Sequence, residues 1–158
     1  MTEELLAAAL VRKLKRRGLT VATAESITGG GLAEAITAIS GASAVYLGGH
    51  IVYSDQTKVK LLAVPKRVLN KESAVSEPVA RQMAEEVRRT FAADYGIATT
   101  GVAGPGRAYG QKAGTVWIAV ASKRETVAIC LDLRGTRSEV RHATIESAIA
   151  SFERILTP

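Results

Sequence analysis

A strand, a glycine-rich turn and a helix follow one another near the start of the chain, and this unit constrains the fold most strongly. The turn is Thr23–Gly31 (TAESITGGG), between an apolar segment at 19–22 and a helix-like segment at 32–39. Its glycines let a ligand approach the backbone, and the helix start offers free N–H groups to an anion or an oxyanion. A flexible loop without a ligand is the alternative, and only the rest of the chain can decide between them.

The same alternation of strands and helices continues along the chain. We expect strands at 20–24, 48–54, 95–100, 115–121 and 126–133, and helices at 2–17, 31–40, 55–62, from 76 and from 136. Strands that alternate with helices and then end in a hairpin predict a three-layer-like α/β sandwich with a mixed sheet. The 158 residues are 47% hydrophobic and contain no linker or repeat, so we expect one domain over 1–158.

Local signals support several of these helices. Thr2 can cap the first one, Ser76 can cap the long central one, and Thr136 with Glu139 matches a capping box. The apolar face that we predict for the first helix consists of Leu5, Leu6, Ala9, Leu10 and Leu14. Because Leu5, Leu10 and Leu14 could be free to pair with a second copy, we expect a homodimer or a higher homo-oligomer.

The charge balance favours an anionic partner. The chain has 21 Lys and Arg against 15 Asp and Glu, a formal charge of +6, with the strongest basic cluster at 12–17. A solvated helix end explains that cluster without a ligand, because cations there complement the helix dipole. Aromatic residues make up 4% of the chain, and no nucleic-acid-binding motif is present, so a nucleic-acid partner is poorly supported.

Cysteine, histidine and hydropathy patterns exclude several classes of protein. Cys130 is the single cysteine, and we expect it to be a buried thiol within a strand. His50 and His142 lie far apart without cysteine companions, so no metal site is predicted. Neither a secretory leader nor an apolar run long enough to span a bilayer is present. We therefore expect a cytoplasmic protein without a membrane partner.

Three segments carry reactive groups at the ends of predicted strands: 25–31, 53–58 and 100–106. Ligands bind beyond the carboxyl ends of strands in open α/β sheets, so these segments could converge. Neither histidine is placed to activate a serine, but a lysine with a lowered pKa can be the base. Ser26 and Lys58 with backbone N–H groups would then suit acyl transfer or amide hydrolysis. Taken singly, Lys58 is more typical of a surface helix and Ser26 of a helix cap than of a catalytic pair.

Five motifs in this order resemble the CinA C-terminal domain family, the nicotinamide-nucleotide amidases (NMN deamidases). They are 23–30 (TAESITGG), 52–58 (VYSDQTK), 74–77 (AVSE), 101–105 (GVAGP) and 114–117 (GTVW), and they cover essentially the whole chain. The resemblance implies metal-free hydrolysis of nicotinamide mononucleotide to nicotinic acid mononucleotide and ammonia, in pyridine nucleotide recycling. It implies no cofactor, and a small-molecule substrate as the partner.

The resemblance also implies roles for individual residues. Ser26 would be the nucleophile, Lys58 its base, and Tyr53 an orienting or proton-relay group. The remaining predicted residues would bind substrate: Thr28, Gly29 and Gly30 around the amide or oxyanion, Thr100, Gly101 and Ala103 around the nicotinamide and ribose, and Arg137 and Arg141 at the 5′-phosphate. Ordinary surface charge is the alternative for both arginines.

Three departures from the family pattern bear on specificity. Ile27 stands where the family often has cysteine, Thr100 replaces a commoner serine, and the segment 107–110 (RAYG) replaces a glycine-rich loop that contains serine. The altered loop keeps a second hypothesis open, a non-catalytic nucleotide-binding or regulatory module on the same fold. A nucleic-acid binder is the third hypothesis, and it rests on the net charge alone.

Overall fold

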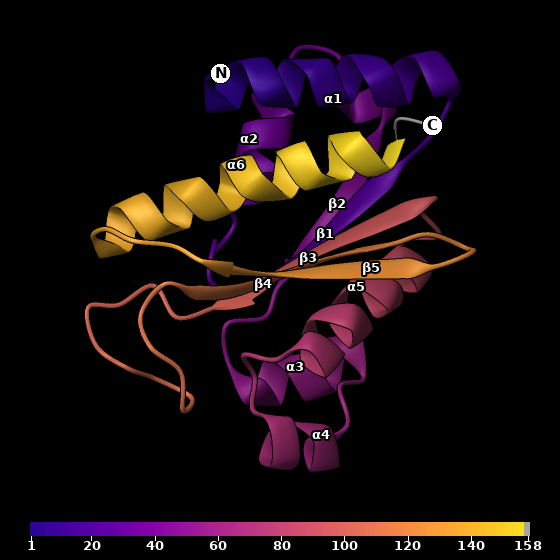
Figure 1. The fold of residues 1–158 in the computed structure, drawn as a ribbon. Helices are drawn as coiled ribbons and strands as arrows, with labels where there is room; N and C mark the ends of the chain where they lie inside the picture. Colours follow the sequence, from indigo (N-terminus) through magenta and orange to yellow (C-terminus); the bar gives the residue numbers. More distant parts are fainter. Residues whose placement is uncertain (157–158) are drawn as a thin grey trace.

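A five-stranded mixed sheet forms the middle layer of the computed structural model, which describes residues 1–156 (Figure 1). Its strand order is β2-β1-β3-β4-β5. The bounds are β1 Val21–Glu25, β2 Tyr46–Ile51, β3 Tyr95–Gly101, β4 Thr115–Ala121 and β5 Thr126–Asp132. Strands β2, β1 and β3 run parallel, whereas β3, β4 and β5 pair antiparallel. The carboxyl ends of the three parallel strands therefore lie at one edge of the sheet.

Helices cover both faces of this sheet. Their bounds are α1 Glu3–Arg17, α2 Gly31–Thr37, α3 Asp55–Leu62, α4 Lys66–Glu72, α5 Glu77–Thr90 and α6 Arg137–Leu156. Helices α1, α2 and α6 pack together on one face, and α3, α4 and α5 on the other (Figure 1). Each face buries its own apolar cluster, one around Phe152 and one around Met83. The predicted single-domain α/β sandwich with a mixed sheet is confirmed.

Several element bounds differ from the prediction. Strand β2 begins at Tyr46 and ends at Ile51, earlier than predicted, because it pairs in parallel with β1 over that stretch. Helix α2 stops at Thr37, and a short 3₁₀ turn at Ala42–Ala44 follows it. Helix α4, which follows Pro65, was not predicted, whereas α3 has the predicted bounds.

Side-chain caps fix most of the predicted helix starts. The Thr2 hydroxyl accepts from the N–H of Leu5, and the Thr136 and Glu139 side chains accept from one another's backbone N–H groups. The capping box predicted there is thus confirmed. Ser76 does precede α5, but its hydroxyl donates to the carbonyl of Ser73 and leaves the helix N–H groups alone.

The predicted apolar face of α1 is only partly correct. Leu5 is 59% exposed, and the buried face of α1 consists of Ala7, Leu10, Val11 and Leu14. Since Leu10 and Leu14 are fully buried within the chain, they are not free to pair with a second copy. Of the three leucines, Leu5 alone is exposed, and the homo-oligomer stays a prediction.

Cys130 is exposed and not buried as predicted. It lies on β5, an edge strand, beyond the part that α5 covers. Thr126, at the start of β5, is held by the α5 side chains Arg81 and Glu85, which leaves the far end of that strand face open.

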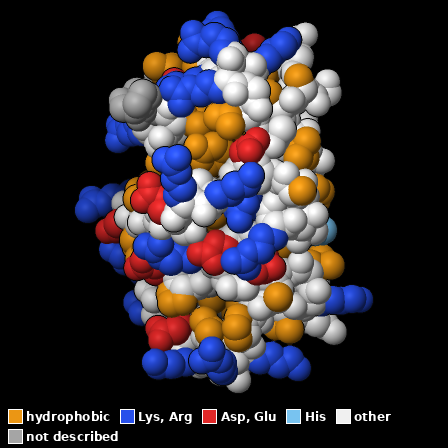
Figure 2. Space-filling model, turned by 90° about the vertical axis from the view of Figure 1, so that its right-hand side faces the viewer, with side chains coloured by type: hydrophobic (Ala, Val, Ile, Leu, Met, Phe, Trp, Pro, Cys, Tyr) orange, Lys and Arg blue, Asp and Glu red, His pale blue; other side chains and the backbone are white. Residues whose placement is uncertain are grey.

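Charged side chains of both signs share the end of the molecule where α1 ends. Lys15, Arg16 and Arg17 occupy the last turn of α1, as the dipole argument predicts. Figure 2 looks onto this end and shows mainly Lys and Arg side chains at the top, where α1 lies, and a mixture of Lys, Arg, Asp and Glu across the middle of the face. Among the residues that the structure describes, no helix has the length and apolar character needed to cross a membrane.

Candidate active site

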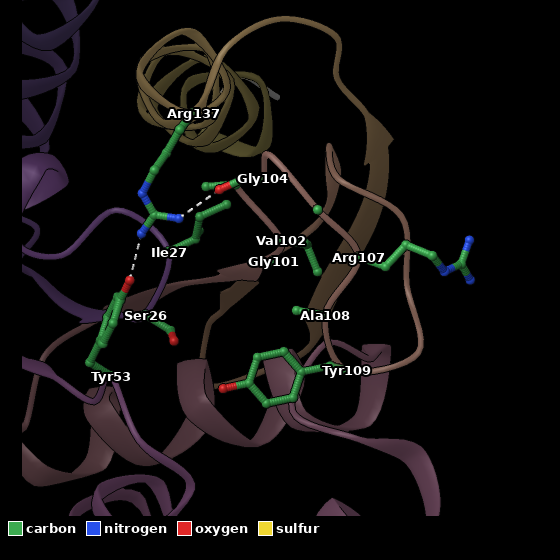
Figure 3. Close-up of a pocket in the computed structure, with 12 residues that line it drawn as sticks. Ser26, Ile27, Tyr53, Gly101, Val102, Gly104, Arg107, Ala108, Tyr109 and Arg137 are labelled. Atoms are coloured by element: carbon green, nitrogen blue, oxygen red, sulfur yellow. Dashed lines mark hydrogen bonds between the residues drawn. The ribbon is translucent and has the colours of Figure 1, made fainter.

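A cavity of about 310 Å³ opens at the carboxyl ends of β1 and β3, where the predicted segments converge (Figure 3). Segments that are far apart in sequence supply its walls: the turn after β1, the residue Tyr53 after β2, the loop between β3 and β4, and the start of α6. The lining residues are Ser26, Ile27, Tyr53, Gly101, Val102, Ala103, Gly104, Gly106, Arg107, Ala108, Tyr109 and Arg137. Of the predicted site residues, Ser26, Tyr53, Gly101, Ala103 and Arg137 therefore share one cavity.

Ser26 and Lys58 are in direct contact beneath this cavity. The Lys58 Nζ donates to Ser26 Oγ at 3.0 Å and to the carbonyl of Val52 at 2.8 Å. Helix α3 positions the lysine, because a capping box between Ser54 and Thr57 fixes the helix start immediately before it. Lys58 is 1% exposed, so the surface-lysine alternative is wrong.

Burial lowers the pKa of Lys58 below the usual 10.5, and the nearby Asp55 carboxylate opposes this effect. Both groups that accept hydrogen bonds from its Nζ are uncharged, a hydroxyl and a carbonyl. An ammonium without a bonded carboxylate is costly to bury, so burial shifts the equilibrium toward the neutral amine. A neutral amine within hydrogen-bond distance of a serine hydroxyl can remove its proton.

The Glu25 carboxylate organises the turn that carries Ser26, a role that the sequence analysis did not assign. This side chain is buried and accepts four hydrogen bonds: the Thr28 hydroxyl at 2.6 Å and the N–H groups of Gly30, Leu32 and Ala33 at 2.8–3.0 Å. It thereby closes the start of α2, where a negative charge is favoured by the helix dipole. A carboxylate between a strand and a glycine turn was the signal that could have identified this role.

This network uses the groups that were predicted to hold the substrate amide. The Thr28 hydroxyl bonds Glu25 and Thr99, the Gly30 N–H bonds Glu25, and the Gly29 N–H donates to the carbonyl of Ser26. In the described part of the chain, the N–H groups of Ile27 and Thr28 have no hydrogen-bond partner. These two N–H groups, one residue or two after the serine, are therefore the candidate oxyanion donors, of which Ile27 lines the cavity and Thr28 is buried behind it. Gly29 and Gly30 instead supply positive φ angles of 58° and 100°, which L side chains rarely adopt.

The two arginines that were predicted to bind phosphate occupy different surroundings. Arg141 donates to the carbonyls of Ile27 at 3.2 Å and Thr28 at 3.0 Å, and does not line the cavity. Arg137 does line it, and bridges the Tyr53 hydroxyl at 2.8 Å and the carbonyl of Gly104 at 3.0 Å (Figure 3). Only Arg137 is placed to meet a ligand.

Thr100 does not reach the cavity. Its hydroxyl is buried and donates to the carbonyl of Ala74 at 2.8 Å, on the α5 side of β3. Because side chains alternate across a strand, the Thr100 hydroxyl points to the face that α5 covers, and it is not part of the cavity lining. Gly101 and Ala103 do line the cavity, and a Cβ on Gly101 would lie 2.8 Å from the carbonyl oxygen of Thr115.

Arg107 and Tyr109 also line the cavity, although the sequence analysis gave them no role in binding. Both belong to the loop that departs from the family pattern, and that departure was the available signal. Over residues 1–156, no group of three His, Cys, Asp or Glu side chains is placed to hold a metal ion.

Comparison with known proteins gives the family. The model of the CinA C-terminal domain matches residues 3–156. CinA-like proteins of Syntrophus aciditrophicus and Gloeobacter violaceus are 45% and 44% identical, over 98% and 96% of this chain. The chain spans about a third of the length of these relatives, 37% and 36%.

Solved structures agree with this result. A CinA superfamily protein of Escherichia coli superposes with a TM-score of 0.95 at 36% identity, covering 98% of this chain and 90% of the other. A competence damage-inducible protein A of Klebsiella pneumoniae gives 0.97 at 34% identity, covering 99% and 98%. The chain belongs to the CinA C-terminal domain family.

Proposed function

We propose that this domain is a nicotinamide-nucleotide amidase that hydrolyses the carboxamide of nicotinamide mononucleotide. One observation carries the proposal above all others. A buried lysine, without a bonded carboxylate and with a lowered pKa, donates to the hydroxyl of a serine that lines a cavity. A lysine buried for stability alone would pair its charge, whereas a general base needs the neutral amine.

The first half of the reaction forms an acyl-enzyme. Neutral Lys58 takes the hydroxyl proton of Ser26 while Oγ bonds to the carboxamide carbon. The N–H groups of Ile27 and Thr28 stabilise the negative oxygen of the tetrahedral intermediate. Collapse of the intermediate breaks the C–N bond, and the Lys58 ammonium returns its proton to the leaving nitrogen, which departs as ammonia.

The second half consumes one water. The water oxygen attacks the ester carbon as Lys58 takes a water proton, and collapse returns that proton to Ser26 Oγ. Nicotinic acid mononucleotide leaves as the carboxylate after giving a proton to solvent. Arg137 binds the 5′-phosphate, and Tyr53, whose hydroxyl accepts from Arg137, orients the substrate or relays protons between them.

The test is an assay of purified protein with nicotinamide mononucleotide, measuring ammonia and nicotinic acid mononucleotide together. Equal amounts of the two products would support the proposal, with Ser26→Ala as the blank for contaminating amidases. Absence of both products over a broad range of pH and temperature would overturn it. Calorimetric binding of the nucleotide without turnover would instead support the non-catalytic module suggested by the altered loop.

A further inference from the structure

The loop between β3 and β4 contains a tight turn that carries Tyr109. Ala108 and Gln111 exchange both backbone hydrogen bonds, at 3.1 and 2.9 Å, and the two residues between them have φ angles of 53° and 73°. Two positive φ angles in a two-residue hairpin are typical of a type I′ turn, for which Asn-Gly is the preferred pair. Here Tyr109 precedes Gly110, so a large side chain occupies a backbone conformation that disfavours it. Strain of this kind at a cavity wall points to a function for the side chain.

The Tyr109 ring is free to meet a ligand. It lines the cavity and is 49% exposed, and among residues 1–156 its hydroxyl has no hydrogen-bond partner. Figure 3 shows the ring extending from the loop toward the side where Ser26 and Tyr53 lie. The Arg107 side chain points the other way, and its guanidinium donates to the carbonyl of Gly110. The turn therefore presents an aromatic ring to the cavity and directs its neighbouring positive charge outward.

The charges around the cavity make the Tyr109 ring important for the affinity of ligands that carry a cationic ring. Its lining contains Arg107 and Arg137 but, within the described chain, no Asp or Glu. A cationic ring that entered would find no carboxylate to pair with. The electron-rich faces of Tyr53 and Tyr109 are the attractive groups left for it. The Tyr53 hydroxyl accepts a hydrogen bond from the Arg137 cation, which withdraws electron density from that ring and leaves Tyr109 as the more electron-rich face.

We propose that Tyr109 is a specificity-determining residue that stacks on a positively charged planar ring and so selects N-substituted pyridinium ligands over uncharged ones. The proposal rests on the proposed function, and names the part of the substrate that this loop recognises. A partly exposed cation–π contact corresponds to about a 3- to 10-fold change in affinity.

Two ligands that differ only in the ring test it. Nicotinamide mononucleotide has a cationic pyridinium, whereas its reduced form has a neutral dihydropyridine on the same ribose phosphate. Dissociation constants for both are measured by calorimetry in the Ser26→Ala background, with Tyr109, Tyr109→Phe and Tyr109→Leu. We expect Tyr109→Leu to weaken binding of the oxidised form by about 3- to 10-fold and to change the reduced form less than twofold. Tyr109→Phe keeps the ring face and should leave both constants within about twofold.

An equal loss for the two ligands would show that Tyr109 supplies bulk only, and would overturn the proposal. An unchanged preference in Tyr109→Leu, or failure of the oxidised form to bind, would overturn it as well. A Tyr109-dependent preference in a protein that does not release ammonia would support this inference and remove the proposed function. If the protein hydrolyses nicotinamide mononucleotide but its preference for the oxidised form does not depend on Tyr109, the proposed function would be supported and this inference would be overturned.

Discussion

The turn after β1 and the loop after β3 form two walls of the same cavity, but they are built differently. In the turn, the Glu25 carboxylate satisfies four donors and Arg141 holds two carbonyls, all partly or fully buried. In the loop, Arg107 and Tyr109 are exposed, and a two-residue hairpin carries the ring. Buried hydrogen bonds fix the turn after β1, whereas the side chains of the loop after β3 are exposed to solvent.

This difference matches what each wall has to do under the proposed function. Attack by Ser26 needs its oxygen and the two N–H groups held within a fraction of an ångström, which buried networks achieve. Recognition of a ring needs a surface that can vary between relatives without disturbing the chemistry. Loops on a rigid scaffold provide such a surface. Substitutions in one wall should therefore leave the role of the other wall intact.

The largest effect should come from the reacting pair. Ser26→Ala and Lys58→Met should each lower kcat by at least about 10³-fold, because the two side chains act as one unit. Methionine is close to the lysine stem in length, so the fold should survive, as circular dichroism would check. Substantial activity in either variant would remove that residue from its proposed role.

Substitutions of Arg141 and Arg137 should affect different kinetic parameters, kcat for Arg141 and KM for Arg137. Arg141→Lys loosens the carbonyls of Ile27 and Thr28, so kcat should fall by up to about 10²-fold for nicotinamide mononucleotide and its riboside alike. Arg137→Lys should mainly raise KM, and only for the phosphorylated substrate. Steady-state kinetics with both substrates measures this. A loss in Arg141→Lys confined to KM of the nucleotide would restore the original phosphate assignment.

Glu25→Gln should destabilise the whole fixed wall. Its amide places donors opposite the N–H groups of the α2 start, and we expect the free energy of unfolding to fall by about 1–3 kcal/mol. Urea unfolding measures the change. Glu34→Gln is the matched control, an exposed carboxylate of the same helix that should change stability by less than about 0.5 kcal/mol. Equal stability of the two variants would contradict the role of Glu25.

Tyr109→Asn should raise the stability of the protein and weaken its binding of substrate. Asparagine tolerates a positive φ, so the free energy of unfolding should rise by up to about 1 kcal/mol, while affinity for nicotinamide mononucleotide falls. Tyr109→Val is the control, because a β-branched residue fits this backbone poorly and should lower stability. A rise in stability for valine would show that the turn carries no strain.

The smallest effect concerns pH. Lys58 must be neutral to act as base, so kcat/KM should rise with pH and then level off. Because burial lowers the pKa of Lys58, this rising limb should lie below the ordinary lysine pKa. The Asp55 carboxylate favours the ammonium and raises that pKa. Asp55→Asn should therefore move the limb to lower pH. Glu125→Gln is the control, an exposed substitution in the hairpin between β4 and β5, and it should leave the limb at the same pH. A shift of the limb to higher pH in Asp55→Asn would contradict the assignment of the limb to Lys58.

Much of the fold followed from local rules. Helix α3 has the predicted bounds, and the capping box of Thr136 and Glu139 forms as the pattern predicts. The convergence of the segments after β1, β2 and β3 also followed, because parallel strands end at one edge. The predicted surroundings of Thr100, Arg141 and Cys130 were less accurate. The side-chain direction of Thr100 depends on strand alternation, and the contacts of Arg141 depend on where α6 packs. The exposure of Cys130 depends on how far α5 extends over β5.

The sequence by itself determined the alternation of strands and helices, except for α4, as well as the glycine-rich turn after β1 and the residue types that can react. Those properties depend on neighbours within a few positions, where backbone preference and capping act. Only the tertiary structure decided that Lys58 is buried against Ser26, 32 positions away, and that Glu25 takes the N–H groups that the glycine turn was expected to offer. Burial and competition for donors depend on contacts between distant segments, so they exist only once the sheet has assembled.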